Sequence, residues 1–226
     1  FYTYGVNLKS NFLIKNINLK KEFTEFDLLV NVPNKRKQKI KKIKIPLLGL
    51  HNVRNSVAAA AVALTVGISV KNIKDGLLKF KGVQRRFNKI FSHNNIDFFD
   101  DYAHHPTEIK MVLDGVKKVY GGYGKVCIFQ PHRISRLKDL KEEFSSAFTN
   151  ADIVILCPIY TAGEKIKLGF NYLNFAKEII KNSNVKLFMV ENKIQLAKFI
   201  KSNIYGRKSV IGMGAGTITN WMRDLP

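Results

Sequence analysis

The chain has 226 residues, of which 46% are hydrophobic and 11% aromatic, and its formal net charge is +21. This composition indicates a globular protein with a substantial core and excludes a disordered chain. No apolar run approaches the roughly 20 residues that cross a bilayer, so no membrane segment is expected. Because lysines occur along the whole chain, we favour a compositional bias or an anionic substrate over nucleic-acid binding.

The first 46 residues show the patterns of short strands and no helix. Strands are expected at 2–6, 12–19, 25–32 and 39–45, and the last should carry its lysines outward. The chain starts inside the first of these runs and lacks an initiator methionine. We therefore expect a fragment that begins within a domain.

An alanine-rich helix is predicted over 57–64, following the segment 49–56, and a second helix over 70–79. Asn52 and Asn55 lie three residues apart, so they are expected on one helix face near its start. Capping is an ordinary role for one asparagine at such a place. Two of them beside His51 suggest contact with a polar ligand such as a nucleobase edge.

From residue 82 onward, strand and helix patterns alternate. Strands are expected at 89–91, 96–99, 125–129, 153–156, 186–190 and 209–213, and helices at 107–119, 137–148, 171–181, 194–202 and 218–222. This alternation predicts an α/β fold with a Rossmann-like, mostly parallel sheet. The boundary with the preceding section is expected near Lys81.

Polar clusters follow several of the predicted strands, at 100–108, 130–136, 158–164 and 212–217. A single Asp at such a place is ordinarily a helix cap, and a single His is ordinarily solvated. Because the carboxyl ends of parallel strands meet at one edge, the four clusters together predict a composite ligand site. The glycines of 212–216 resemble a phosphate-binding loop only loosely and lack the context of a dinucleotide fingerprint.

Cys127 and Cys157 each lie in an apolar, strand-like run without CxxC spacing. This pattern predicts buried free thiols in a reducing compartment such as the cytoplasm.

Four motifs occur in a recognisable order along the chain. They are Gly49-x-His51-Asn52-x-x-Asn55, Gly82-Val83-x-Arg85-Arg86-Phe87, Asp-Asp-Tyr-Ala-His-His-Pro-Thr-Glu at 100–108, and Gln130-Pro131-His132-Arg133. From about Gly49 to Gly216 the chain resembles the Mur ligase family. The resemblance implies that 1–81 is the β-rich and helical end of a central ATPase domain and that 82–226 is the C-terminal Rossmann-like domain.

The resemblance also implies ATP-dependent amide bond formation in peptidoglycan precursor synthesis, with ATP and Mg²⁺ as cofactors. L-Alanine would be added to UDP-N-acetylmuramate through an acyl phosphate. A murein-tripeptide recycling ligase shares the motif at 100–108, whereas Gln130-Pro131-His132-Arg133 favours the alanine-adding branch. The chain has no Gly-x-x-Gly-Lys-Thr loop and no counterpart of the family's magnesium ligands, so we expect it to be inactive alone and to supply no metal ligand.

By the same resemblance, Asn52 and Asn55 would contact the adenine, and Arg86 and Asp101 the rest of the nucleotide, with Asp101 at the ribose. The muramoyl and alanine pocket would be lined by Tyr102, His104, His132, Arg133 and Arg136. His104, His132 and Arg133 are the catalytic candidates, and either histidine is a candidate general base. Thr217 stands where the family usually has an acidic residue, which is expected to weaken a contact at a helix start.

Two other kinds of protein remain as alternatives. A metal-dependent hydrolase could use His104, His105, His132 and Asp100 or Asp101, although adjacent histidines rarely bind one metal with good geometry. A non-catalytic, RNA-binding module would account for the charge of +21, but the pattern of aromatic and basic residues on a sheet face that such modules use is absent from residue 82 onward.

Overall fold

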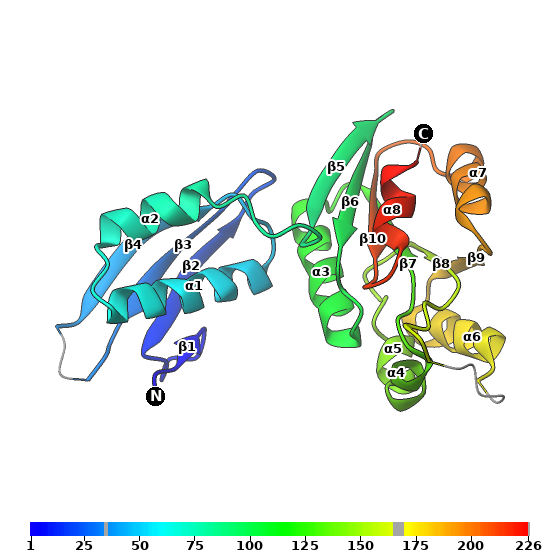
Figure 1. The fold of residues 1–226 in the computed structure, drawn as a ribbon. Helices are drawn as coiled ribbons and strands as arrows, with labels where there is room; N and C mark the ends of the chain where they lie inside the picture. Colours follow the sequence, from blue (N-terminus) through cyan, green and yellow to red (C-terminus); the bar gives the residue numbers. More distant parts are fainter. Residues whose placement is uncertain (34–35, 165–169, 226) are drawn as a thin grey trace. The chain divides into compact units, whose positions relative to one another are not determined.

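The structure is a computed structural model that describes residues 1–33, 36–164 and 170–225. The chain divides into two compact units, unit 1 (Phe1–Val83) and unit 2 (Gln84–Pro226), each built on its own sheet (Figure 1). Within the described ranges, none of the helices combines the length and the apolar character needed to cross a membrane.

Unit 1 is a four-stranded sheet with two helices packed on one face (Figure 1). Its elements are β1 (Tyr4–Gly5), β2 (Phe12–Leu19), β3 (Thr24–Val30), β4 (Gln38–Ile45), α1 (Leu50–Thr65) and α2 (Val70–Lys79). The strands lie in sequence order, and all pairs are antiparallel except β1 with β2. The predicted strands and helices are therefore confirmed, although the first strand has only two residues.

Strand β4 carries its lysines outward, as predicted, although the pair Lys41-Lys42 breaks the alternation of the sequence. The structure accommodates this pair with a bulge in which Lys42 has a φ of 53°. The carboxylate of Asp27 on β3 accepts the amide N–H of Lys42 at 2.8 Å and holds the bulge. As a result, Ile40 and Ile43 are both buried in the core of unit 1.

Unit 2 contains the six-stranded sheet β5-β6-β10-β7-β8-β9. Its strands are β5 (Asn88–His93), β6 (Ile96–Asp101), β7 (Gly124–Phe129), β8 (Ile153–Leu156), β9 (Lys186–Met189) and β10 (Lys208–Met213). Its helices are α3 (Pro106–Val119), α4 (Ile134–Asp139), α5 (Lys141–Ser145), α6 (Tyr172–Ser183), α7 (Lys193–Asn203) and α8 (Ile218–Arg223). Only β5 pairs antiparallel, so the predicted mostly parallel α/β sheet is confirmed.

Helices cover both faces of this sheet (Figure 1). Side chains of α7 and α8, including Leu196 and Met222, pack with Ile128 of β7 on one face. On the other face Phe129 of β7 contacts Phe144 at a ring-centroid distance of 5.7 Å. Because neighbouring residues of a strand point to opposite faces, the apolar run at the end of β7 fills two cores at once.

The prediction of one helix over 137–148 is wrong. The segment forms α4 and α5, and the break lies at Leu140. Glu142 and Glu143 occupy the first turn of α5, where carboxylates favour a new helix start. The hydroxyl of Ser145 then donates to the carbonyl oxygen of Glu142 at 2.6 Å and competes with further helix growth.

Both cysteines are free and buried, as predicted. Burial raises the pKa of the Cys157 thiol to about 12 and that of Cys127 higher still. The thiols are therefore protonated core side chains rather than nucleophiles.

Candidate functional site

The carboxyl ends of four parallel strands lie level with one another in unit 2. Asp101 of β6 pairs with Met213 of β10, which in turn pairs with Phe129 of β7, and Phe129 pairs with Leu156 of β8. The loops after these strands therefore start at one edge of the sheet, as the sequence predicts.

Asp101 ends β6 and is 1% exposed. Its two carboxylate oxygens accept the amide N–H groups of Phe87 and Ala103, each at 2.7 Å. Burial raises the pKa of Asp101 to about 6, while these two hydrogen bonds and the nearby Arg86 oppose the rise. The carboxylate thus anchors the segment that contains Arg86 to the end of the strand.

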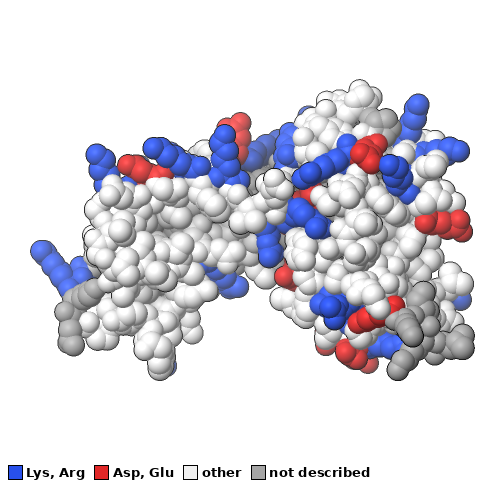
Figure 2. All heavy atoms as spheres, viewed as in Figure 1, with Lys and Arg blue, Asp and Glu red and all other residues white. Residues whose placement is uncertain are grey.

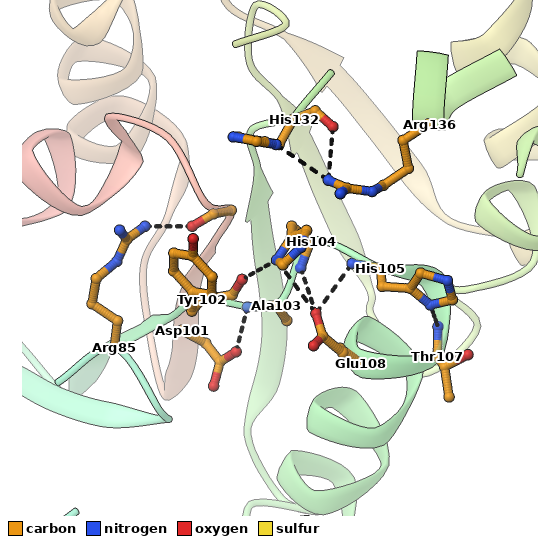
Figure 3. Close-up of polar contacts among 11 residues, drawn as sticks. Arg85, Asp101, Tyr102, Ala103, His104, His105, Thr107, Glu108, His132 and Arg136 are labelled. Atoms are coloured by element: carbon orange, nitrogen blue, oxygen red, sulfur yellow. Dashed lines mark hydrogen bonds and ion pairs between the residues drawn. The ribbon is translucent and has the colours of Figure 1, made fainter. Parts of the chain in front are cut away.

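The ring of Tyr102 is flanked by two guanidinium groups. The guanidinium carbon of Arg85 lies 4.7 Å from the ring centre and that of Arg86 lies 5.9 Å away. Arg85 also donates from Nη2 to the carbonyl oxygens of Gly214 (2.5 Å) and Gly216 (3.3 Å). Arg85 therefore links the Tyr102 turn to the loop after β10 (Figure 3).

His104 presents its Nδ1 atom to oxygen acceptors. This atom lies 2.9 Å from the carbonyl oxygen of Tyr102 and 3.5 Å from Oε2 of Glu108 (Figure 3). Because both partners only accept, we assign the neutral-ring proton to Nδ1. The Nε2 atom of His104 then keeps its lone pair.

The helix after this turn is capped by His105. The alternative in which Asp100 or Asp101 caps the helix is therefore wrong. The Nδ1 atom of His105 accepts the amide N–H of Thr107 at 3.3 Å, and Glu108 accepts the amide of His105 at 3.2 Å. These bonds form a capping box at the start of α3. Asp100 instead accepts a hydrogen bond from the hydroxyl of Thr219.

His132 follows β7 and has the opposite hydrogen-bonding arrangement to His104. Nη1 of Arg136 donates to its carbonyl oxygen at 3.1 Å and lies 3.2 Å from its Nδ1 (Figure 3). Nδ1 is therefore assigned as the acceptor, and Nε2 carries the proton of the neutral ring. Desolvation, followed by the charge of Arg136, lowers the pKa of His132.

The residues predicted to line the muramoyl and alanine pocket lie at this same edge. The rings of His104 and His132 are 5.8 Å apart between centroids, and those of Tyr102 and His104 are 5.1 Å apart. Arg133 has a half-exposed side chain whose Nη1 lies 4.0 Å from Glu164. Their contact with a substrate stays a prediction.

Asn52 and Asn55 lie on α1 in unit 1 and differ in burial. Asn52 is 5% exposed, and its amide donates to the carbonyl oxygen of Leu48 at 2.8 Å. Asn55 is exposed. Neither caps α1, because the N-cap residue is Gly49, which has a φ of 94°. Their role at an adenine also stays a prediction.

The glycines after β10 are required by packing within unit 2. A Cβ at Gly214 would lie 2.6 Å from the carbonyl oxygen of Gln130, and one at Gly216 would lie 2.6 Å from the ring of Tyr160. The side-chain amide of Gln130 donates to the hydroxyl of Thr217 at 3.1 Å, and its oxygen accepts the backbone N–H of Ile218. Thr217 makes no side-chain cap to α8.

Two observations on the described parts of the chain concern the metal-dependent hydrolase and the RNA-binding module. There, no three His, Cys, Asp or Glu side chains come together in a way that could hold a metal ion. On the face drawn in Figure 2, Lys and Arg side chains are spread over both units rather than gathered in one patch.

Several site residues were not singled out by sequence reasoning. Glu108 carries a recognisable signal, since it stands three residues after the cap in His-Pro-Thr-Glu. Arg85 and Gln130 belong to the quoted motifs, yet nothing in the sequence shows that they bind backbone atoms of a distant loop. Glu164 carries no local signal, because its partners are about thirty residues away.

Comparisons with known proteins give consistent results. Residues 85–216 match the family described as Mur ligase, glutamate ligase domain, and residues 1–63 match the Mur ligase middle domain. The chain is 66% identical over 226 residues to UDP-N-acetylmuramate–L-alanine ligase of Pelagibacter ubique, covering all of this chain and 49% of that protein. The protein of the same name from Bartonella tribocorum is 36% identical, with coverages of 99% and 47%.

A solved structure of UDP-N-acetylmuramate–alanine ligase from Thermotoga maritima superposes with a TM-score of 0.79 at 27% identity, covering 99% of this chain and 46% of that one. A murein peptide ligase from Psychrobacter arcticus has the same fold, with a TM-score of 0.66 at 24% identity and coverages of 99% and 45%. The chain spans about half the length of the curated relatives it matches.

Proposed function

The chain belongs to the Mur ligase family, and on this basis we propose that it is part of an enzyme that joins L-alanine to UDP-N-acetylmuramate with ATP. The observation that carries the proposal is its 66% identity, over all 226 residues, to the Pelagibacter ubique protein of that name. The chain spans about half of that relative, so the activity is proposed for the longer protein. This chain would contribute part of the active site.

In this assignment residues 1–81 are the end of the middle domain and 82–226 the C-terminal domain. The matched ranges 1–63 and 85–216 support it. Asn52 and Asn55 would contact the adenine, and Arg86 and Asp101 the rest of the nucleotide. Each oxygen of Asp101 accepts one backbone N–H, which leaves acceptor capacity for a ribose hydroxyl.

The proposed reaction has two steps. The muramoyl carboxylate takes the γ-phosphoryl group of ATP, which yields an acyl phosphate and ADP. The amine of L-alanine then attacks the acyl carbon, so that the amide bond forms and phosphate leaves. Magnesium would offset phosphate charge in such a reaction, but the described residues provide no ligand set for it, and its ligands are expected in the rest of the longer protein.

The side chains at the sheet edge suit the second step. Arg133 and Arg136 present guanidinium groups, which bind carboxylate and phosphate oxygens in a fork. In this scheme the Nε2 lone pair of His104 would take the proton that the attacking amine loses. The Nε2 proton of His132 would be donated in a hydrogen bond to an oxygen of the acyl phosphate. Tyr102 would form a wall of the pocket beside His104.

The test is phosphate release that depends on ATP, UDP-N-acetylmuramate and L-alanine together. We would compare the 226-residue chain with a full-length protein that joins it to the part of the Pelagibacter ubique relative that it does not match. Activity in the full-length protein only is expected. Release that requires the murein tripeptide in place of L-alanine would assign the recycling reaction instead, and no release with either would refute the ligase proposal.

Arg133→Ala tests the placement of the substrate in this scheme. We expect it to lower kcat/KM for UDP-N-acetylmuramate in the full-length protein by about 100-fold, because a charge-assisted contact to an anionic group is lost. The Kd for ATP should change less than about twofold. Arg223→Ala, at an exposed position of α8, is the matched control. Equal losses for both substrates would contradict the placement.

A further inference from the structure

Helix α4, which carries Arg136, begins without a cap of its own. The residue at its N-cap position is Arg133, whose side chain makes no capping hydrogen bond, and its first turn contains no acidic residue. The first amides of a helix need acceptors from elsewhere. Glu164, in the loop after β8, accepts the amide N–H groups of Ile134 at 2.8 Å and Ser135 at 3.1 Å.

The contact with Ser135 is made twice, because its hydroxyl donates to Oε1 of Glu164 at 2.6 Å. This hydroxyl bond is the largest of the causes that lower the pKa of Glu164, followed by the amide of Ser135. Glu164 itself is held in a turn, where its amide donates to the carbonyl oxygen of Thr161 at 3.0 Å. A carboxylate held by its own turn thus receives three hydrogen bonds from the start of α4.

The same two loops are joined again on the other side of Arg133. The amide N–H of Arg133 donates to the carbonyl oxygen of Tyr160 at 2.9 Å. The amide N–H of Tyr160 in turn donates to the carbonyl oxygen of Pro131 at 2.8 Å. The rings of His132 and Tyr160 stack with centroids 5.5 Å apart. Residues 131–135 are therefore fixed at both ends by the loop after β8.

Arg133 lies between these two attachments in an unfavourable backbone conformation, with φ 71° and ψ 131°. A residue other than glycine adopts such a φ only when its surroundings enforce it. Glu164 is one of those surroundings, through the two residues that follow Arg133 and through Nη1 of Arg133 itself, 4.0 Å away. Without Glu164, Arg133 would keep its hydrogen bond to Tyr160 but lose the restraint from the two residues that follow it.

We propose that Glu164 is a positioning residue for the muramoyl substrate, which it serves by holding the backbone of His132, Arg133 and Arg136 in place at the sheet edge. The inference rests on the proposed ligase function and deepens it. Glu164 is not assigned a contact with substrate. Its effect is expected on the binding of the muramoyl compound and not on the nucleotide, whose proposed contacts are at other residues.

The test uses Glu164→Ala, Glu164→Gln and, as the matched control, Glu143→Ala, which removes an exposed carboxylate from α5. In the full-length protein, Glu164→Ala should raise the KM for UDP-N-acetylmuramate by about tenfold, because displaced groups lose productive geometry. The KM for ATP should stay within about twofold. Glu164→Gln keeps an acceptor for the amide of Ile134 and should stay within about threefold of the wild type.

The outcomes separate the two proposals. If the wild type and Glu143→Ala release no phosphate, both the ligase function and the role of Glu164 are refuted. If the wild type is active and Glu164→Ala behaves like Glu143→Ala, only the positioning role is refuted. The same holds if Glu164→Ala changes the KM of both substrates equally, because that result indicates a general structural role.

Discussion

The two histidines at the sheet edge differ in which ring nitrogen carries the proton, and this difference separates their proposed roles. Nδ1 of His104 lies 2.9 Å from the carbonyl oxygen of Tyr102, so Nε2 is the acceptor. Nδ1 of His132 lies 3.2 Å from Nη1 of Arg136, so Nε2 is the donor. A proton acceptor for the incoming amine is therefore expected at His104.

His104→Gln should lower kcat of the full-length protein by about 100-fold, because an amide cannot take a proton from the amine. His132→Gln is the matched variant, because the side-chain NH₂ of the new glutamine can still donate a hydrogen bond. A larger loss of kcat in His132→Gln than in His104→Gln would reverse the assignment.

Asp101 gives a second prediction at this scale. Burial raises its pKa from 3.8 to about 6 in the folded state. Between these two values the folded chain binds more protons than the unfolded chain, so the contribution of Asp101 to stability grows as the pH falls. Between pH 7 and pH 5 the wild type should gain about 1 kcal/mol relative to Asp101→Asn.

This gain is measured by denaturant unfolding of the 226-residue chain at several pH values, with a spectroscopic signal that reports on unit 2. Asp139→Asn, at an exposed position of the same unit, is the control for the effect of the substitution itself. If Asp101→Asn and the wild type keep a constant difference from pH 7 to pH 5, the carboxyl group is not buried in the way the structure describes.

The residues of the candidate site differ in how far the sequence could reveal them. Asp101, His104 and His132 were found because each follows a predicted strand, and parallel strands end at one edge. Glu164 could not be given its role in this way, because its hydrogen bonds to the start of α4 depend on the path of two loops. Which nitrogen of each histidine is protonated likewise depends on distances that no spacing in the sequence encodes.

At the scale of elements, the loop after β10 is the most constrained piece of the edge. Gly214 has a φ of 150°, and a Cβ there would lie 2.6 Å from the carbonyl oxygen of Gln130. That oxygen belongs to backbone and cannot swing away without moving the segment that carries His132. Gly214→Ala should therefore destabilise unit 2 by about 2 kcal/mol or more.

Gly122→Ala is the matched control for this prediction. A Cβ at Gly122 would meet no atom within 4 Å, so its effect should stay within about 0.5 kcal/mol. Both variants are compared by denaturant unfolding of the 226-residue chain, with a signal from unit 2. Equal stability of the two variants would show that the loop has more freedom than its packing indicates.

The elements themselves were predictable where periodicity and breakers agree. Helix α2 and strand β8 have the predicted bounds, Val70–Lys79 and Ile153–Leu156. Residues that favour turns lie near their ends: glycine beside the helix, and Asn and Asp beside the strand. The segment 137–148 misled the prediction, since its apolar residues fit one continuous helix. The break at Leu140 is accompanied by carboxylates in the first turn of α5 and by the hydrogen bond from the hydroxyl of Ser145 to Glu142, and these signals are weaker than the apolar pattern.

At the scale of the whole molecule, each unit buries apolar residues of its own. Leu28 lies in the core of unit 1, and Leu156 lies in the sheet of unit 2, and both are 0% exposed. Because each unit buries its own apolar residues, we expect calorimetry of the 226-residue chain to resolve two unfolding transitions.

A matched pair of variants assigns those transitions. Leu28→Ala and Leu156→Ala make the same chemical change, and each should lower the midpoint of one transition by on the order of 10 °C and leave the other in place. The reason is that a cavity in one core removes contacts from that unit only. A single transition that moves in both variants would mean that the two units unfold as one cooperative structure. In that case a substitution in either unit would also weaken the candidate site, and the losses predicted for Arg133 and His104 would have to be measured below the unfolding range of each variant.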